Sequence, residues 1–474
     1  MGRSAVTIAA VACSVVVLLV YTATMAPSLT WAHNGADGGE LVTAVTRGTI
    51  PHPPGFPTYL LLGEVFIRFP WGTPAWRLNL MSAVLAATAA GLMVVASWRL
   101  LDRTENEGPA VLCAACAGLT LGLSPLFWSQ ALITEVYAPA SFFTALVIVL
   151  ALGRTPVWML SLAWGAGVGA HATLIFLAPI VVWRGLTDAD GRRHHFGRLA
   201  TIGITALLAW GILHGPVLLA RGTKPFPWGD LNTPAGWWAL VSAKLYRGYP
   251  FALPLRDWPQ RLLAWIGLLA RQFTPIGAVL AGLGVDRLWR TRRPLAVASI
   301  ISFGAFSLYA VGYNTTDSLV YLTLALPLAA LWLATGLVGV TGWITRRMRH
   351  GEWAILLLPL LLPMLFWKQM DISDDTDATT WADQVLKSAP PQAVLLTERD
   401  AHTFTLWYAH DVLGQRPDVV VIDQDLWDLA PYRTMITDIL GLEDSESELT
   451  PEEAAHRAGR SLVSTEQLTP EEAP

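Results

Sequence analysis

Charged side chains are scarce in this sequence. Only 14% of its 474 residues are Asp, Glu, Lys or Arg, whereas soluble globular domains carry about 25%. The mean hydropathy is +0.45. A folded surface with so few charges cannot face water throughout, so lipid must be the solvent for most of the chain. The net charge of −4 gives no indication of nucleic-acid binding.

Cysteine is also rare, and internal repeats are absent. Cys13, Cys113 and Cys116 all lie in apolar stretches. The C-x-x-C spacing of the last two could indicate a redox pair, but small residues packed within a membrane helix explain it better. The sequence therefore indicates no disulfide framework, no metal site and no cofactor.

Long apolar runs are what the sequence has in abundance, and runs of about 20 residues suffice to cross a bilayer. We predict eleven spans: the run that follows Arg3 to about Met25, Trp76–Ala96, Pro109–Leu126, Ala138–Leu152, two short helices within Pro156–Trp183, Leu199–Ala220, Leu262–Leu283, Leu295–Tyr313, Leu319–Ile344 and Trp353–Phe366.

Basic residues in short loops set the predicted orientation. Arg99–Arg103, Arg184–Arg198, Arg287–Arg293 and Arg346–Arg349 fall on one side of the eleven spans, and such loops face the cytoplasm. The first run resembles a signal peptide, but it is long and lacks a clean cleavage site, so we interpret it as an uncleaved span. We expect a multi-pass protein of the cytoplasmic (inner) membrane, with its N-terminus cytoplasmic and its C-terminus extracytoplasmic.

The composition divides the chain into three parts. Residues 1–367 form the predicted transmembrane domain, whose first external loop covers residues 27–74. Residues 368–440 contain two short apolar runs, Val394–Thr397 and Val419–Asp423, with a helical pattern between them. This pattern predicts a small α/β domain with parallel strands. Residues 441–474 are acidic and nearly free of aromatics, which predicts a disordered tail.

The first external loop has the densest set of candidate site residues. Asp37 and Glu40 flank two glycines, which leave room for a bound molecule, and His52 lies in a proline-rich stretch that restricts its backbone. The alternative is a solvated loop with turn residues.

Four further residues on the predicted outer side are candidates for substrate binding: Glu135, His171, Asp230 and Asp317. A carboxylate near the membrane is costly and often functional. Glu135 could instead pair with a loop arginine, and His171 could simply bond a backbone carbonyl. The nearby aromatic residues are most simply interface anchors.

Arg271 is a separate candidate, because it falls inside the predicted span Leu262–Leu283. An unpaired guanidinium there would be costly, so we expect a carboxylate or phosphate partner. Together these residues predict an external cavity with acidic groups, which fits an enzyme with a lipid-carried donor or a transporter. A transporter would more often have paired halves and midplane charges, so we favour the enzyme.

The segment Asp37-Gly38-Gly39-Glu40-Leu41, followed by His52-Pro53-Pro54-Gly55-Phe56-Pro57, resembles the first-loop signature of a GT-C-type membrane glycosyltransferase family. This family includes the animal transmembrane O-mannosyltransferase of plexin-type receptors and many bacterial multipass proteins of unknown function. Leu41 departs from the usual phenylalanine. Weaker similarity continues through Phe127–Tyr137, Gly165–His171, Trp228–Asp230, Asn314–Tyr321 and Arg416–Val419.

The resemblance implies a GT-C fold and inverting transfer of a sugar, mannose or a related hexose, from a polyprenyl-phosphate donor to a protein or glycan acceptor. It places Asp37 where GT-C enzymes have the acidic residue that acts as base or positions the acceptor. We expect Glu40 to orient the acceptor, and His52 or Arg271 to stabilise the leaving phosphate. The alternative is a non-catalytic transporter or an assembly factor for surface polysaccharide.

Overall fold

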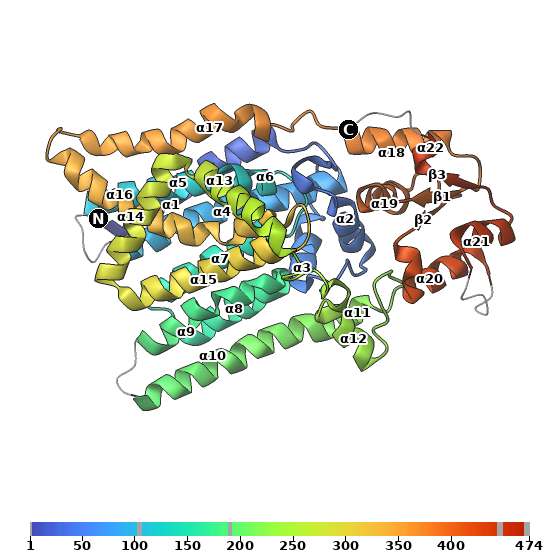
Figure 1. The fold of residues 1–474 in the computed structure, drawn as a ribbon, viewed down its shortest axis with the longest axis horizontal. Helices are drawn as coiled ribbons and strands as arrows, with labels where there is room; N and C mark the ends of the chain where they lie inside the picture. Colours follow the sequence, from blue (N-terminus) through green and yellow to red (C-terminus); the bar gives the residue numbers. More distant parts are fainter. Residues whose placement is uncertain (1, 102–106, 188–191, 443–448, 469–474) are drawn as a thin grey trace.

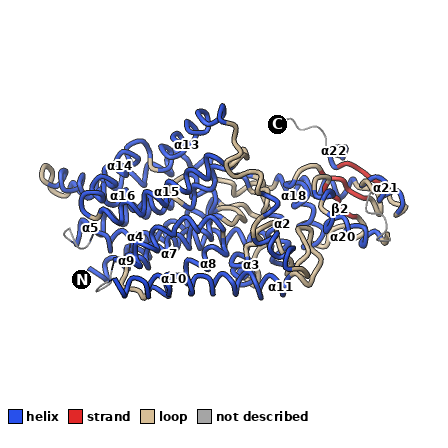
Figure 2. The backbone as a smooth tube through the Cα atoms, turned by 60° about the horizontal axis from the view of Figure 1, so that its bottom comes forward, coloured by secondary structure: helices blue, strands red, loops and turns tan. Residues whose placement is uncertain are grey.

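The computed structural model of the chain describes residues 2–101, 107–187, 192–442 and 449–468. Helices fill most of it and form an elongated bundle, and a small α/β domain lies at one end (Figure 1). Figure 2 shows all the strands gathered at that end.

Six of the described helices are long and apolar enough to cross a membrane. They are α1 (Gly2–Thr24), α4 (Pro74–Leu101), α10 (Arg192–Ile212) with its continuation through α11 (Leu218–Arg221), α15 (Arg293–Gly312), α16 (Leu326–Thr345) and α17 (Leu357–Met370) with the preceding turn η7 (Gly351–Leu356).

Two further candidates are bent pairs. Helices α5 (Glu107–Gly122) and α6 (Pro125–Ala131) meet at 62°, and α13 (Trp258–Gln272) and α14 (Thr274–Thr291) meet at 95°. Length and composition therefore give six spans, or up to eight if each pair is one span. The number eleven stays a prediction, because it also requires the short helices α7 (Tyr137–Leu152), α8 (Val157–Ala170) and η2–α9 (Ala172–Leu177 and Ala178–Thr187) to cross.

The predicted span Leu262–Leu283 is not one continuous helix. The chain turns between Gln272 and Thr274, where Thr274 has a positive φ of 60°. Pro275 follows, and a proline has no N–H to continue a helix and restricts the residue before it. Arg271 consequently lies in the last turn of α13 instead of inside an apolar span.

Basic residues gather at the end of the bundle away from the sheet. The end of α9 with Arg184, the α14–α15 junction with Arg293, and the end of α16 near Arg346 all lie there, beside the N-terminus (Figure 1). The α/β domain and the first long loop lie at the opposite end.

The predicted first external loop folds into two helices, α2 (Gly38–Arg47) and α3 (Pro57–Phe66), preceded by the short turn η1 (Ala32–Asn34). Gly48, with a φ of 69°, ends α2, since a left-handed residue after a helix favours glycine. Leu41 and Val45 on α2 and Leu60 on α3 are buried in one apolar cluster. The loop is therefore packed structure, not a solvated connection.

The C-terminal domain contains a parallel three-stranded sheet of order β2-β1-β3. Strands β1 (Val394–Thr397) and β2 (Val420–Asp423) confirm the predicted strand–helix–strand unit, with α19 (Asp400–Trp407) and the turn η8 (Tyr408–Val412) between them. Helices α18 (Asp377–Ser388) and α20 (Ala430–Leu440) complete the unit.

The prediction of a disordered tail is wrong for residues 449–468. These residues form α21 (Pro451–Arg457), β3 (Leu462–Ser464) and α22 (Thr465–Leu468), and β3 pairs with β1. Apolar residues at only a few positions, including Leu449 and Ala454, are buried in the domain core, and an average over an acidic segment conceals them. Residues 443–448 and 469–474 lie outside the described part of the chain.

Candidate functional site

The C-terminal domain packs directly on helix α2 of the first loop. A side chain at Gly39 would place its Cβ 2.1 Å from the backbone oxygen of Phe404 on α19, so only glycine allows this approach. Trp31 secures the same contact, because its indole N–H donates to Thr405 Oγ1 at 2.9 Å. Residues far apart in sequence thus meet around Asp37.

Glu40 and His52 form the buried centre of the site. The Glu40 carboxylate lies 2.5 Å from His52 Nδ1 and accepts the His52 backbone N–H at 2.8 Å. The indole N–H of Trp228 also donates to it. The Glu40 side chain is only 4% exposed. Its oxygens are occupied by these donors, which fix the orientation of the His52 ring.

Asp37 is the accessible carboxylate of the pair. It lies one helical turn before Glu40, and its Oδ2 is 3.8 Å from His52 Nε2. The Asp37 side chain is 38% exposed. Because His52 Nδ1 is engaged by Glu40, Nε2 is the ring nitrogen that faces Asp37. The order of groups is buried carboxylate, imidazole, accessible carboxylate.

The charges of this cluster keep His52 protonated. Burial alone would lower the pKa of His52, but the charges of Glu40 and Asp37 and the hydrogen bond to Glu40 outweigh it and raise the pKa to about 9. Burial raises the pKa of Glu40, and the adjacent His52 partly offsets that rise.

Glu135, His171 and Asp317 also belong to this site. Glu135 is buried in the connection between α6 and α7. Burial, and then the charge of Asp37, raises its pKa well above the usual range, while His52 opposes that rise. Asp317 raises it further. Four of the predicted acidic residues therefore lie close enough to interact.

His171 contributes to an aromatic wall of the site. Its ring centre lies 5.6 Å from those of Tyr137 and Tyr321 and 6.0 Å from that of Phe56. Its Nδ1 lies 2.7 Å from Thr173 Oγ1. The local partner is thus a hydroxyl and not the backbone carbonyl of the alternative interpretation.

Two predicted residues are placed elsewhere. Asp230 is exposed, and its Oδ1 accepts from the backbone and side-chain nitrogens of Asn232 at 2.8 and 2.7 Å. It stabilises a turn, and the residue of its segment that reaches the site is Trp228.

Arg271 is exposed and donates to Gln369 Oε1 at 2.8 Å, with its guanidinium 5.4 Å from the centre of the Phe366 ring. Among the described residues, no carboxylate lies within ion-pair distance of it. The expected carboxylate partner is therefore absent from the described part of the chain.

Sequence reasoning missed Asp400, which the C-terminal domain contributes. Desolvation, followed by the charges of Asp423, Asp37 and Glu40, raises the pKa of Asp400 to about 6. The position of Asp400 in the sequence could have indicated this role. Asp400 closely follows strand β1, and site residues are common at the carboxyl ends of parallel strands. Tyr246 also lies at the site, because its ring centre is 6.1 Å from that of His52.

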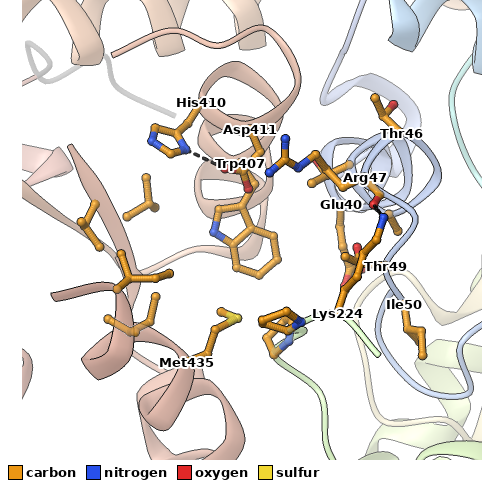
Figure 3. A pocket seen from close by; sticks show the side chains of 18 of the residues that line it. Glu40, Thr46, Arg47, Thr49, Ile50, Lys224, Trp407, His410, Asp411 and Met435 are labelled. Atoms are coloured by element: carbon orange, nitrogen blue, oxygen red, sulfur yellow. Dashed lines mark hydrogen bonds and ion pairs between the residues drawn. The ribbon is translucent and has the colours of Figure 1, made fainter. Parts of the chain in front are cut away.

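A cavity of about 740 Å³ lies beside Glu40, between α2 and the C-terminal domain (Figure 3). Glu40 and Arg47 line it from α2, and Trp407 and Met435 line it from the domain. No group of three or more metal-ligating side chains occurs among the residues described. The site is thus an open acidic centre with an adjoining cleft.

Two family models match the chain. Residues 37–190 match the N-terminal domain of protein O-mannosyl-transferase TMEM260, and residues 378–435 match TMEM260-associated domain 2. The chain is 25% identical over 459 residues to protein O-mannosyl-transferase TMEM260 of Mus musculus. The match covers 86% of this chain and 62% of the mouse protein. For the Dictyostelium discoideum protein of the same name, the identity is 22% over 478 residues, covering 86% and 56%. The chain thus spans less than two thirds of these curated relatives, and the resemblance seen in the first loop is confirmed.

Two solved structures share the fold of this chain. The structure of ArnT from Cupriavidus metallidurans bound to undecaprenyl phosphate matches with a TM-score of 0.56 at 12% identity, over 88% of this chain and 90% of that one. The Archaeoglobus fulgidus oligosaccharyltransferase tethered to an acceptor peptide matches with a TM-score of 0.54 at 12% identity, over 95% and 68%. The predicted GT-C fold, a multi-pass helical membrane domain with a small C-terminal sheet, is confirmed.

Proposed function

We propose that this chain is a glycosyltransferase that moves a sugar, mannose or a related hexose, from a polyprenyl-phosphate donor to an acceptor hydroxyl on the extracytoplasmic face. The observation that carries the proposal is the accessible Asp37 beside the buried Glu40–His52 pair. The two curated relatives are named as protein O-mannosyl-transferases, which supports sugar transfer and a protein acceptor.

In the proposed reaction, the acceptor oxygen attacks C1 of the sugar from the side opposite the phosphate. A bond forms between that oxygen and C1, the bond from C1 to the phosphate oxygen breaks, and the polyprenyl phosphate leaves with the electron pair. Asp37 takes the hydroxyl proton. One in-line displacement inverts the configuration at C1, and positioning supplies much of the rate enhancement.

We assign Glu40 a positioning role, which differs from the acceptor contact expected from the sequence. A carboxylate that is 4% exposed and already holds His52 and Trp228 has little capacity left for an acceptor. Its effect on the reaction passes through His52, whose ring it holds with Nε2 3.8 Å from Asp37 Oδ2. As the proton moves to Asp37, the His52 ring remains in place to stabilise the negative charge of the leaving phosphate, the role expected from the sequence.

The donor is proposed to be lipid-linked because the site lies at one end of a bundle of apolar helices (Figure 1). The ArnT structure holds undecaprenyl phosphate in a similar fold, which supports a polyprenyl tail between helices. Arg271 stays our candidate for a phosphate contact, since its partner Gln369 is neutral and its side chain is exposed. A phosphate could replace that neutral partner with a charge-assisted bond.

The proposed orientation puts the site outside the cytoplasm. The basic loops lie at the end of the bundle opposite the α/β domain (Figure 1), and basic loops face the cytoplasm. The first loop and the C-terminal domain would then both be extracytoplasmic.

The donor class can be tested directly. Purified protein is given a peptide acceptor with either a polyprenyl-phosphate mannose or a nucleotide-linked mannose, and the glycosylated peptide is measured by mass spectrometry. Transfer from the lipid-linked sugar is expected. Transfer from the nucleotide sugar alone would refute the donor assignment, and transfer from neither would favour the non-catalytic alternative.

A further inference from the structure

The cavity between α2 and the C-terminal domain reaches Glu40, one helical turn from the proposed catalytic carboxylate of Asp37. Glu40, Ala44 and Arg47 line it and follow one another at spacings of four and three residues along α2. Side chains at these spacings share one face of a helix. Asp37, the N-cap of α2, precedes Glu40 by three residues and so lies on the same face of the helix, next to the end of the cleft that Glu40 lines.

The opposite wall of the cleft is mainly apolar. The Trp407 ring, Val420 of β2 and the side chains of Met435 and Ile436 line it. Figure 3 shows Trp407 and Met435 directed into the space from the C-terminal domain. A surface of this kind favours an apolar side chain, and an aromatic ring contributes much contact area.

Charge at the cleft is divided between its two walls. Arg47 and Lys224 lie on the membrane-domain side, and Asp411 and Asp438 on the other. Lys224 Nζ donates to the backbone oxygen of Arg47 at 2.5 Å. Figure 3 shows the Arg47 guanidinium pointing across the cleft, and the ion pairs found among the described residues do not include it.

We propose that this cleft binds an extended segment of the acceptor polypeptide, with an apolar side chain against Trp407 and an acidic side chain at Arg47. The proposal rests on the proposed function and extends it to acceptor selection. A cationic side chain that faces a cleft without an ion-pair partner is suited to a carboxylate of the ligand. The cleft lies between α2 and the C-terminal domain and not between spanning helices, so a polyprenyl tail is a poorer fit.

The geometry also sets the spacing in the acceptor. Ten residues of helix separate Asp37 from Arg47, which is about 15 Å at 1.5 Å per residue. An extended peptide advances about 3.3 Å per residue. The acidic residue is therefore expected about four or five residues from the hydroxyl that is modified.

Binding and transfer are measured separately to test this. Labelled peptides carry one threonine and, four or five residues to either side, a glutamate or a lysine. Their binding to the Asp37→Asn protein is followed by fluorescence anisotropy, and their kcat and KM for transfer are measured with wild-type protein. The test variant is Arg47→Glu. The control is Lys387→Glu, which makes the same charge reversal at an exposed cation on α18 of the C-terminal domain, outside the cleft.

The expected result is that wild-type binding prefers the glutamate peptide about tenfold and that Arg47→Glu reverses the preference, with KM following binding and kcat little changed. The proposal would be overturned if wild type bound both peptides equally, or if Arg47→Glu weakened the binding of both by the same amount. It would also be overturned if Lys387→Glu had the same effect as Arg47→Glu, or if polyprenyl phosphate displaced the peptide. Charge-dependent binding without any transfer would keep the cleft and refute the proposed function. Transfer without any preference for the glutamate peptide would keep the proposed function and refute the role of the cleft.

Discussion

Replacing Glu40 by glutamine tests whether the buried carboxylate acts through the charge of His52. In the wild type the pKa of His52 rises from 6.5 to about 9. A difference of 2.5 in pKa corresponds to about 3.4 kcal/mol at about 1.36 kcal/mol for each pKa unit. Glutamine removes the main charge that causes this rise but keeps the size of the side chain. Without it, burial should bring the pKa of His52 well below 9.

The sign of the pH dependence follows from the raised pKa. A histidine whose pKa is higher in the folded state stabilises that state fully below its ordinary pKa, near 6.5, and this contribution is lost as the pH rises through about 9. The wild type should therefore unfold at a higher temperature than Glu40→Gln below pH 6.5, by roughly 5 °C. The difference should shrink as the pH rises from 6.5 to about 9.

The assay is thermal unfolding in detergent micelles at a series of pH values. A matched control is Glu64→Gln on the neighbouring helix α3, which breaks the ion pair of Glu64 with Arg221 of α11. The control should lower the unfolding temperature without changing its dependence near pH 9. A Glu40→Gln protein that is less stable by the same amount at pH 7 and pH 10 would show that the pair stabilises through hydrogen-bond geometry and not through charge.

Three further predictions concern docking, topology and the donor. Gly39→Ala should separate α2 from the C-terminal domain and reduce transfer more than tenfold, because its Cβ would lie 2.1 Å from the Phe404 backbone oxygen. Gly38→Ala should be better tolerated, because its Cβ would lie 3.0 Å from a leucine side chain and 3.3 Å from the Thr134 backbone oxygen. Equal activity of the two variants would contradict this. A reporter that is active only in the cytoplasm, fused after Trp381, should be silent, and a bright signal would reverse the topology. Arg271→Leu should raise the KM for the lipid donor about tenfold with little change in unfolding temperature, and an unchanged KM would remove Arg271 from the donor site.

The residues of the first loop could be identified from the sequence, because acidic groups beside glycines and a proline-fixed histidine are unusual next to a membrane. The different environments of these residues could not be predicted from the sequence. Asp37 and Glu40 are equivalent in the sequence, and only the packing of Trp228 and His52 makes one buried and the other accessible. Such long-range contacts leave no local pattern.

The same limit explains the incorrect expectations. Hydropathy averages over a window, so it joined α13 and α14 across the break before Pro275 and placed Arg271 inside a span. It also averaged over the acidic tail and concealed β3, whose pairing with β1 depends on a partner about 68 residues away (Val394 with Leu462). The strands β1 and β2 were predictable because each is a continuous apolar run, as is usual for buried parallel strands.

The central claim is that Asp37 is the base for sugar transfer, and one comparison tests it most directly. Wild type and Asp37→Asn are purified, and their unfolding temperatures are compared to check that both are folded. Each protein is then given polyprenyl-phosphate mannose and a peptide acceptor. The account predicts that Asp37→Asn folds normally and loses at least 100-fold in kcat, which corresponds to about 2.7 kcal/mol of transition-state stabilisation. An Asp37→Asn protein that keeps more than about a tenth of the wild-type rate, a loss below about 1.4 kcal/mol, would contradict it.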